Sequence, residues 1–329
     1  MPSTGELNSE SCPASEPERC RTRNTRVRTG LLVCTDAATI RNVVTAQALQ
    51  LSRPPFAIVN SLGSLEVGLE MVACFERLGA RADRLEHAHT LAVRSIGLTD
   101  AVALVPAGRL IAHDIDRGIG AGVAAGYHNG QHYLEVMLTA LYLARLSGFD
   151  ARRTARVVTA GLIHDFHHDG SRGTVAPFRL EMLAVQKALP YLFKAGVSAE
   201  ERDALEALVL ATEPRAGVPF ARACWAYHDS RAAAPPSSSK LPTPLGRLLG
   251  APALAHEAVL LAEADVLPSI GLTFKHAEQL QVRLGAEWGA TLGRDDKLQF
   301  IDRMVADLSV AAAFVPNVLA LRQEYVAAS

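Results

Sequence analysis

The chain has little of several features that mark whole classes of protein. Aromatic residues make up only 5% of its 329 positions. Basic and acidic side chains are almost balanced, with 33 Lys and Arg against 34 Asp and Glu, so no basic surface for nucleic acid is indicated. Five cysteines are scattered without a CxxC pair, which argues against a disulfide framework and against a cysteine zinc site: Cys12, Cys20, Cys34, Cys74 and Cys224.

Long hydrophobic runs are also missing. No apolar stretch approaches the roughly 18 residues that a membrane span needs. The apolar segment "GLLVC" (30–34) is too short for a secretory signal and follows a run of arginines. We therefore expect a cytoplasmic protein with neither a membrane nor a nucleic acid as partner.

Ala and Leu dominate instead, and this usage is typical of a mainly α protein. Residues 1–26 are rich in Ser, Pro, Glu and Arg, which predicts a disordered tail. Residues 27–118 allow two interpretations. Short apolar segments at 29–35 and 55–61 alternate with helical patterns at 36–51 and 62–80, which suits a small α/β module, but a helical lead-in to the next domain fits as well.

From residue 119 to 329 the pattern is that of one helical domain. The segments 130–148 and 150–168 carry apolar residues at helical spacing, and Asp150 is a suitable N-cap for the second. Further helices are predicted at 177–196, 198–214, 252–271 and 297–315, with Pro190 kinking or ending the first. The Pro- and Ser-rich stretch 231–246 is predicted to be a flexible insertion.

The segment "GLIHDFHHDG" (161–170) concentrates three histidines and two aspartates at the end of an apolar helix. His164 and Asp165 face inward there only if something binds them, because an unpaired buried charge is costly. His168 follows four residues after His164, so it shares the same face if the helix continues. His167 would face elsewhere.

Two further segments carry matching residues. In "YHNGQH" (127–132), His128 and His132 are also four residues apart, at the start of the preceding helix. Consecutive helices joined by a short loop pack antiparallel, which brings His132 near His164 and Asp165. Asp265 ends a late apolar helix, and Glu263 beside it is expected to face solvent. Imidazoles and carboxylates from three helices are ligands for divalent metal ions.

The order of these residues resembles the HD superfamily of metal-dependent phosphohydrolases. "YHNGQH" is similar to the YHNxxH signature of the class I 3′,5′-cyclic nucleotide phosphodiesterases, and "HDFHHDG" to their HDxxHxG. "LVLATEP" is similar to their IxATD stretch, with Glu213 in place of the aspartate. The resemblance covers about residues 125 to 305 and implies a helical HD bundle.

The resemblance also implies roles for single residues. Four would hold the tighter metal ion, which would be zinc, iron or manganese: His132, His164, Asp165 and Asp265. Asp165 would bridge to a second divalent ion, magnesium or manganese. His128 would be the general acid that protonates the leaving ribose oxygen, and His168 would support the water shell of the second ion.

The substrate is less well defined by the sequence. Phe300 would clamp a purine base, but position 297, where the family has a base-reading glutamine, is Lys, and Gln299 lies beside it. The asparagine expected just after HDxxHxG is missing from "GSRGTV" (170–175). We expect a small phosphoester as the partner, with a 3′,5′-cyclic nucleotide first and a linear nucleotide or another phosphoester as alternatives.

Two other functions can be set against hydrolysis. A di-iron HD oxygenase would need additional histidines at the second metal, so His228 or His256 would have to point into the pocket. A regulatory HD domain usually lacks metal ligands, whereas the set here is complete. The oligomeric state is left open by the sequence.

Overall fold

The computed structural model describes residues 55–56, 64–171, 176–232, 234 and 236–328. The chain divides into two units, of which residues 1–41, with the predicted tail, lie outside the described residues. Within the described part of residues 42–329 every regular element is helical and no strand occurs. The predicted mainly α class is confirmed.

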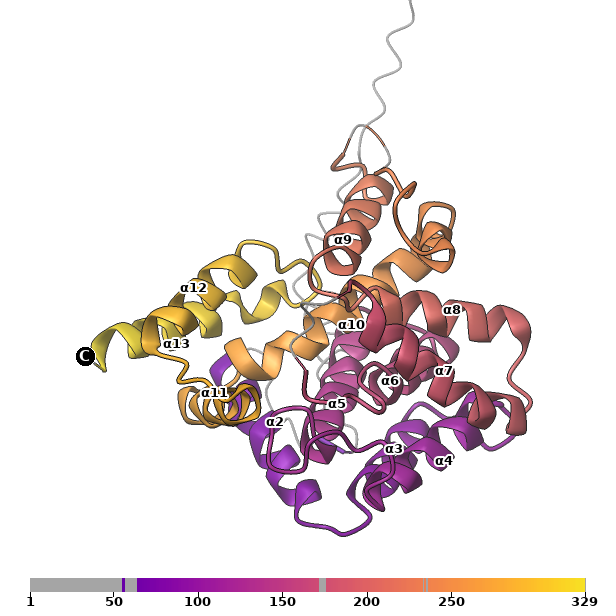
Figure 1. The fold of residues 1–329 in the computed structure, drawn as a ribbon, viewed down its shortest axis with the longest axis horizontal. Coiled ribbons are helices and arrows are strands. Elements are labelled where there is room, and N and C mark those ends of the chain that lie inside the picture. Colours follow the sequence, from indigo (N-terminus) through magenta and orange to yellow (C-terminus); the bar gives the residue numbers. More distant parts are fainter. Residues whose placement is uncertain (1–54, 57–63, 172–175, 233, 235, 329) are drawn as a thin grey trace, which may run out of the picture. The chain divides into compact units, whose positions relative to one another are not determined.

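Three helices form the centre: α5 (Gly130–Leu146), α6 (Ala151–Ile163) and α10 (Pro252–Ile270). Helix α5 packs against both α6 and α10 and is buried on nearly all sides, which its largely apolar sequence permits (Figure 1). Gly161 lets α6 approach α5 closely, since a Cβ there would lie only 3.3 Å from the Cα of Met137. This close approach sets the distance between the functional segments of the two helices.

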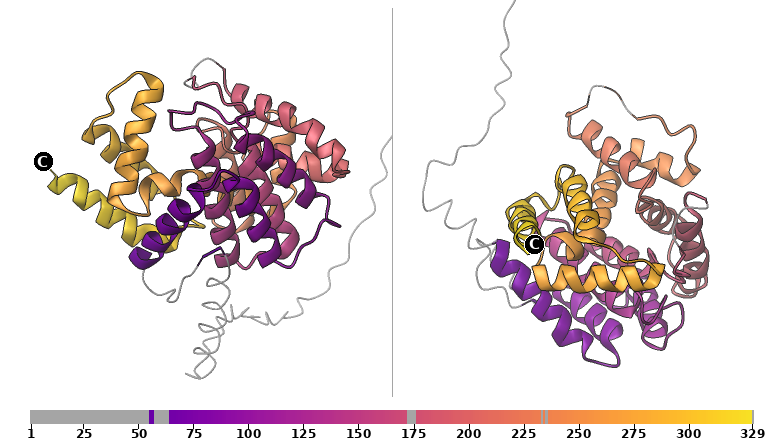
Figure 2. Two further views of the ribbon diagram at one scale, coloured as in Figure 1. Left: turned by 90° about the horizontal axis from the view of Figure 1, so that it is seen from below. Right: turned by 60° about the vertical axis from the view of Figure 1, so that its left-hand side comes forward.

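The N-terminal helices are α2 (Ser64–Gly79), α3 (Arg84–Ser95) and α4 (Leu104–Asp116). Helices α2 and α3 pack against α5, and α4 packs against α6 (Figure 2). The predicted strand 29–35 and helix 36–51 lie outside the described residues, as does most of the predicted strand 55–61. The boundary between this region and the helical domain stays a prediction.

On the right of α10 in Figure 1 lie α7 (Arg179–Lys194) and α8 (Ala199–Leu210), and α9 (Gly217–His228) lies above α10. Pro190 lies inside α7 without ending it. The 3₁₀ helix η1 (Thr243–Leu249) takes in the last four residues of the predicted insertion 231–246, and Leu245 is fully buried. Cys74 and Cys224 are buried free thiols.

On the left of Figure 1 lie α11 (Phe274–Trp288), α12 (Arg294–Val305) and α13 (Val315–Ala327). The 3₁₀ helix η2 (Ala312–Phe314) directly precedes α13. The helix predicted over 297–315 is therefore interrupted after Val305, where α12 ends, and its remainder includes η2 and the first residue of α13. Glu263 of α10 accounts for the break, because its carboxylate accepts hydrogen bonds from the backbone N–H groups of Ser309 and Ala311. The expectation that Glu263 faces solvent is wrong, since it is fully buried.

Among the described helices, none taken singly is long and apolar enough to cross a membrane. The pair η1 and α10 meets the length and composition requirements together, with a bend of 115° between them.

Candidate metal centre

The N-terminus of α5 positions the first two histidines. The side chain of Asn129 accepts hydrogen bonds from the N–H groups of Gln131 and His132, at 2.8 and 3.2 Å, and so caps the helix. His132 then lies in the first turn and His128 in the loop before it. Gly122 allows that loop to close, because its φ is +72° and a Cβ there would overlap the carbonyl oxygen of His128.

The C-terminus of α6 provides the next two side chains. The helix ends at Ile163, and His164 is its C-cap. The Nδ1–H of His164 donates to the carbonyl oxygen of Gly161 at 2.9 Å, which leaves Nε2 as the free nitrogen of the neutral ring. The hydroxyl of Tyr133 donates to the backbone carbonyl of Asp165 and holds the chain as it leaves the helix.

These side chains and Asp265 of α10 converge. Nε2 of His132 lies 3.2 Å from Nε2 of His164. Oδ2 of Asp165 lies 3.1 and 3.0 Å from the same two nitrogens. Oδ1 of Asp265 lies 3.2 Å from His132 and 3.7 Å from His164. The sequence prediction that all four meet in one small space agrees with this geometry.

The donor set fits a cation. When both imidazoles are neutral and Nε2 is unprotonated, four lone-pair atoms face one another without a hydrogen between them, and only a metal ion or added protons can offset their repulsion. In the metal-free protein, protons fill this role. Burial opposes charging of His132, but the carboxylates of Asp165 and Asp265 outweigh it and raise its pKa to about 9.

The same balance acts on the other members of the cluster. Burial also opposes charging of His164, and the nearby carboxylates raise its pKa well above the usual value. Burial alone would raise the pKa of Asp165, but the imidazoles of His164, His128 and His132 hold it well below the ordinary range. The imidazoles of His132 and His164 lower the pKa of Asp265 in the same way. In the four groups, protonated imidazoles are therefore paired with carboxylates, and a metal ion can take the place of the protons on the two imidazoles.

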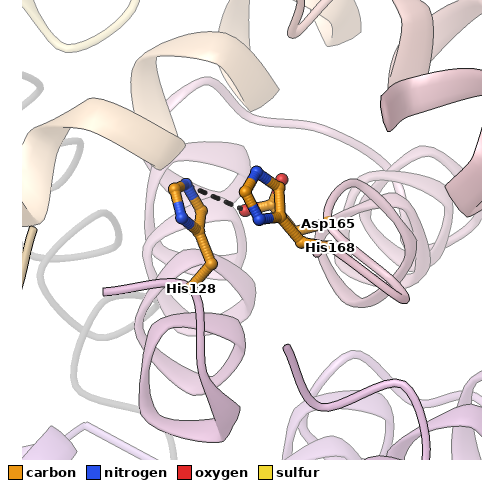
Figure 3. Close-up of side chains that lie close together, drawn as sticks. All are labelled: His128, Asp165 and His168. Atoms are coloured by element: carbon orange, nitrogen blue, oxygen red, sulfur yellow. Dashed lines mark ion pairs between the residues drawn. The ribbon is translucent and has the colours of Figure 1, made fainter. Parts of the chain in front are cut away.

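A second potential metal group shares Asp165 with the first. It consists of His128, Asp165 and His168, whose ligand atoms all lie within 4.8 Å of one another. Figure 3 shows the rings of His128 and His168 facing each other, stacked at 3.8 Å between centroids, with the Asp165 carboxylate beside them. The condition that the helix continues is not met, because α6 ends at Ile163, and His168 reaches this position through the turn that follows.

Glu287 of α11 holds His128 and was not recognised in the sequence. Its carboxylate accepts from Nδ1 of His128 at 2.5 Å and from the backbone N–H of His128 at 2.9 Å. Burial alone would raise the pKa of Glu287, but the hydrogen bond from His128 outweighs it and lowers the pKa. Nε2 of His128 is left facing Asp165, at 3.9 Å from Oδ2. No local signal pairs the two residues, because 159 positions separate them.

Glu181 of α7 is a further carboxylate beside the cluster. Burial, and then the charges of Asp165 and Glu213, raise the pKa of Glu181 to about 7. Glu213 itself is committed to structure, since one carboxylate oxygen accepts from the N–H groups of residues 215–217 at the start of α9. The sequence offered no means to select Glu181, which stands within an ordinary amphipathic pattern.

A cavity of about 460 Å³ adjoins the cluster. His128 and Asp265 line it on the side of the candidate metal centre, together with Tyr127, whose hydroxyl lies 3.1 Å from Oγ of Ser269. Gln299 and Phe300, the residues expected at the substrate, line it from α12, and so does Lys297. Apolar side chains complete the walls: Val266, Leu280, Leu284, Trp288 and Leu292.

The other histidines named from the sequence lie outside the cluster. His167 has a φ of +66° and forms a T-shaped contact with Phe166. Nε2 of His228 donates to the carbonyl oxygen of Leu248 at 2.8 Å, and His256 stacks on Trp225 with ring centroids 4.2 Å apart. Neither His228 nor His256 belongs to a potential metal group in the described part of the chain.

No protein-family model matches the chain, and no curated protein matches it. Among solved structures it is similar to LmjPDEB1 from Leishmania in complex with the inhibitor IBMX, with a TM-score of 0.56 and 14% identity. The match covers 85% of this chain and 96% of that one. LmjPDEB1 is a class I cyclic nucleotide phosphodiesterase catalytic domain. The chain therefore has the fold of such a catalytic domain, with histidine and aspartate groups that could bind metal ions.

Proposed function

We propose that this chain is a phosphodiesterase that uses two divalent metal ions to hydrolyse a phosphoester, with a 3′,5′-cyclic nucleotide as the first candidate substrate. The observation that carries the proposal is the convergence of His132, His164 and Asp165 with Asp265, all as lone-pair donors. The shared fold with a phosphodiesterase catalytic domain supports it.

In this proposal the four residues hold the tighter ion, and Asp165 bridges to a second ion near His128 and His168. Asp165 is the one residue that belongs to both potential metal groups. Bound divalent ions would lower the pKa of a shared water and stabilise charge on the phosphoryl oxygens. Water adds to phosphorus, the bond from phosphorus to the ribose oxygen breaks, and a proton goes to that oxygen.

His128 is suited to supply this proton. Its Nδ1–H is engaged by Glu287, so the ring cannot turn, and Nε2 points toward Asp165. A protonated ring then offers Nε2–H to a leaving oxygen in the cavity. An imidazole is effective as a general acid near neutral pH. His168, stacked on His128, would hydrogen-bond water at the second ion.

The positions of His228 and His256 support hydrolysis over a di-iron oxygenase, because neither adds a ligand to the second metal group. The complete ligand set likewise supports an enzyme over a regulatory HD domain.

The test is an assay of the zinc- and magnesium-loaded protein against cyclic AMP, cyclic GMP, a cyclic dinucleotide and bis(p-nitrophenyl) phosphate. We expect His132→Ala and Asp165→Ala to lose bound metal and turnover together, while His167→Asn, which tolerates the positive φ, keeps both. Metal content is measured by elemental analysis. Hydrolysis that survives either alanine substitution would contradict the proposal.

A further inference from the structure

A second cavity, of about 750 Å³, is lined by residues of α2, α3, α4, α5 and α11. It shares no lining residue with the cavity at the candidate metal centre, although both reach the same loop. Tyr127 and His128 line the cavity at the metal centre, and the next two residues, Asn129 and Gly130, line the second cavity. The proposed function makes no use of the second cavity, and its volume is that of a small-molecule site.

Two arginines line the second cavity from different helices. Arg84 belongs to α3 and Arg283 to α11, and both are only partly exposed. Neither forms an ion pair or a hydrogen bond with any of the described residues. A guanidinium group keeps its charge at any physiological pH, and arginine is seldom buried without a partner. Two unpaired guanidinium groups on one cavity therefore indicate an anionic ligand.

The surroundings of Arg84 add further positive charge. Its guanidinium lies against Gly130, the first residue of α5, where a Cβ would overlap Nη2 of Arg84. The N-terminus of a helix carries a partial positive charge, because its first N–H groups have no intrahelical partners. The guanidinium and this end of α5 therefore repel each other, and an anion close to both would offset the repulsion.

The acidic residues of the second cavity do not pair with the two arginines. Oδ2 of Asp116 accepts from the backbone N–H groups of residues 85 and 86, at 3.1 and 3.0 Å, and so holds the start of α3. Glu135 is fully buried, and its carboxylate lies 3.1 Å from Nε2 of His276. Glu76 is exposed. The positive charge of the two guanidinium groups thus remains available to a ligand.

We propose that the second cavity binds a small phosphate monoester, whose phosphate group is held by Arg84 and Arg283 together. A phosphate monoester carries about two negative charges at pH 7, which matches two guanidinium groups, whereas a carboxylate carries one. Each guanidinium can donate two parallel hydrogen bonds to phosphate oxygens. The side chains of Gln131 and Gln279 also line the cavity, and their amides suit the hydroxyl groups of the rest of the ligand.

Asn129 links the second cavity to His128. Its side chain caps α5, and the residue also lines the second cavity. A ligand bound there would contact the residue directly after the proposed general acid, while the four candidate metal ligands lie outside the lining of this cavity. The inference goes beyond the proposed function, and its test requires no turnover.

The test is titration calorimetry of the zinc- and magnesium-loaded full-length protein with ribose 5-phosphate, inorganic phosphate and succinate. Phosphate can also bind to metal ions, so the titration is repeated with Asp165→Ala, which should lack them. We expect a site for ribose 5-phosphate that Asp165→Ala retains. Its affinity should fall about 10-fold or more in Arg84→Met and in Arg283→Met. Arg94→Met on α3 and Lys275→Met on α11, both at exposed positions outside the cavity, are the matched controls and should keep the wild-type affinity.

Arg84→Lys keeps the charge and should bind ribose 5-phosphate more tightly than Arg84→Met does. Binding that Asp165→Ala abolishes and Arg84→Met leaves unchanged would place the phosphate at the metal centre and overturn the proposal. Equal or tighter binding of succinate, or no binding of either phosphate, would also overturn it. A wild type that hydrolyses no phosphoester but binds ribose 5-phosphate through the two arginines would refute the proposed function and uphold this site.

Discussion

One carboxylate, that of Glu287, contacts both the ring and the backbone of His128: Nδ1 lies 2.5 Å and the backbone nitrogen 2.9 Å from its two oxygens. The ring and the loop that carries it are therefore positioned by the same residue of α11. Because a carboxylate only accepts, Nδ1 must carry the hydrogen, and Nε2 becomes the end of the ring that faces the candidate metal centre.

The first prediction concerns this contact. Glu287→Gln should lower kcat for a cyclic nucleotide about 10- to 100-fold, less than the roughly 10²–10⁴-fold that general-acid catalysis contributes, since the acid remains but is less well oriented. Bound metal should be retained. Bis(p-nitrophenyl) phosphate, whose leaving group needs no proton, should lose much less rate. Glu278→Gln on the exposed side of α11 is the control, and equal losses on both substrates would refute a role in proton transfer.

A second prediction concerns proton release on metal binding. In the metal-free protein, the carboxylates of Asp165 and Asp265 raise the pKa of His132 to about 9 and that of His164 well above its usual value. Both rings are then protonated at pH 7 and must lose their protons to bind an ion, so zinc binding should release about two protons and weaken as the pH falls. Titration calorimetry in buffers of different ionisation enthalpy measures the number. Release of no protons at pH 7 would contradict this account.

A third prediction concerns the pH dependence of stability. His89 of α3 is fully buried, and neither ring nitrogen has a hydrogen-bond partner among the described residues. Burial, aided by the charge of Arg109, lowers its pKa from 6.5 to about 4. Above pH 6.5 the ring is neutral in the folded and in the unfolded protein. Between pH 6.5 and 4 the ring is protonated in the unfolded chain but still neutral in the folded protein. The free energy of unfolding should therefore decrease as the pH is lowered from 6.5 toward 4, and this residue accounts for up to about 3 kcal/mol of the decrease.

His89→Leu should remove that part of the pH dependence, whereas His87→Gln on the same helix should leave it in place. Chemical denaturation of the metal-free protein at pH 7 and pH 4.5 provides the comparison. A wild-type and a His89→Leu protein that lose the same free energy between these pH values would show that His89 does not contribute.

The fourth prediction couples His89 to Gly108 of α4. In a helix interior, Gly→Ala usually stabilises by about 1 kcal/mol. Here an added Cβ would overlap the imidazole of His89, which is enclosed on all sides, so Gly108→Ala should destabilise the wild-type protein. In a His89→Ala background the same substitution should stabilise. A double-mutant cycle measures the coupling, and equal effects in both backgrounds would exclude the contact.

Parts of the candidate site could be predicted from local sequence. His132 stands at the start of one apolar helical pattern and His164 at the end of the next, and consecutive antiparallel helices bring these two termini together. Asn129 and Asp150 act as N-caps because their short side chains reach the free N–H groups of the first turn. Such interactions span a few residues, so the sequence itself contains them.

Other parts required the tertiary structure. Helix α10 is apolar around almost its whole circumference, so helical periodicity could not tell which of Glu263 and Asp265 faces solvent. Tertiary packing decides between the two residues. The carboxylate of Glu263 accepts hydrogen bonds from the backbone of Ser309 and Ala311, and the carboxylate of Asp265 lies against the imidazole of His132.

What the sequence by itself determined is the helical class and the residues able to bind a metal ion, because both follow from residue type and short-range spacing. Only the tertiary structure decided that Glu287 orients His128 and that Lys297 is buried without a carboxylate partner among the described residues. The physical reason is that both properties depend on tertiary packing: 159 positions separate Glu287 from His128, and Lys297 is buried where α12 contacts Ala277 of α11.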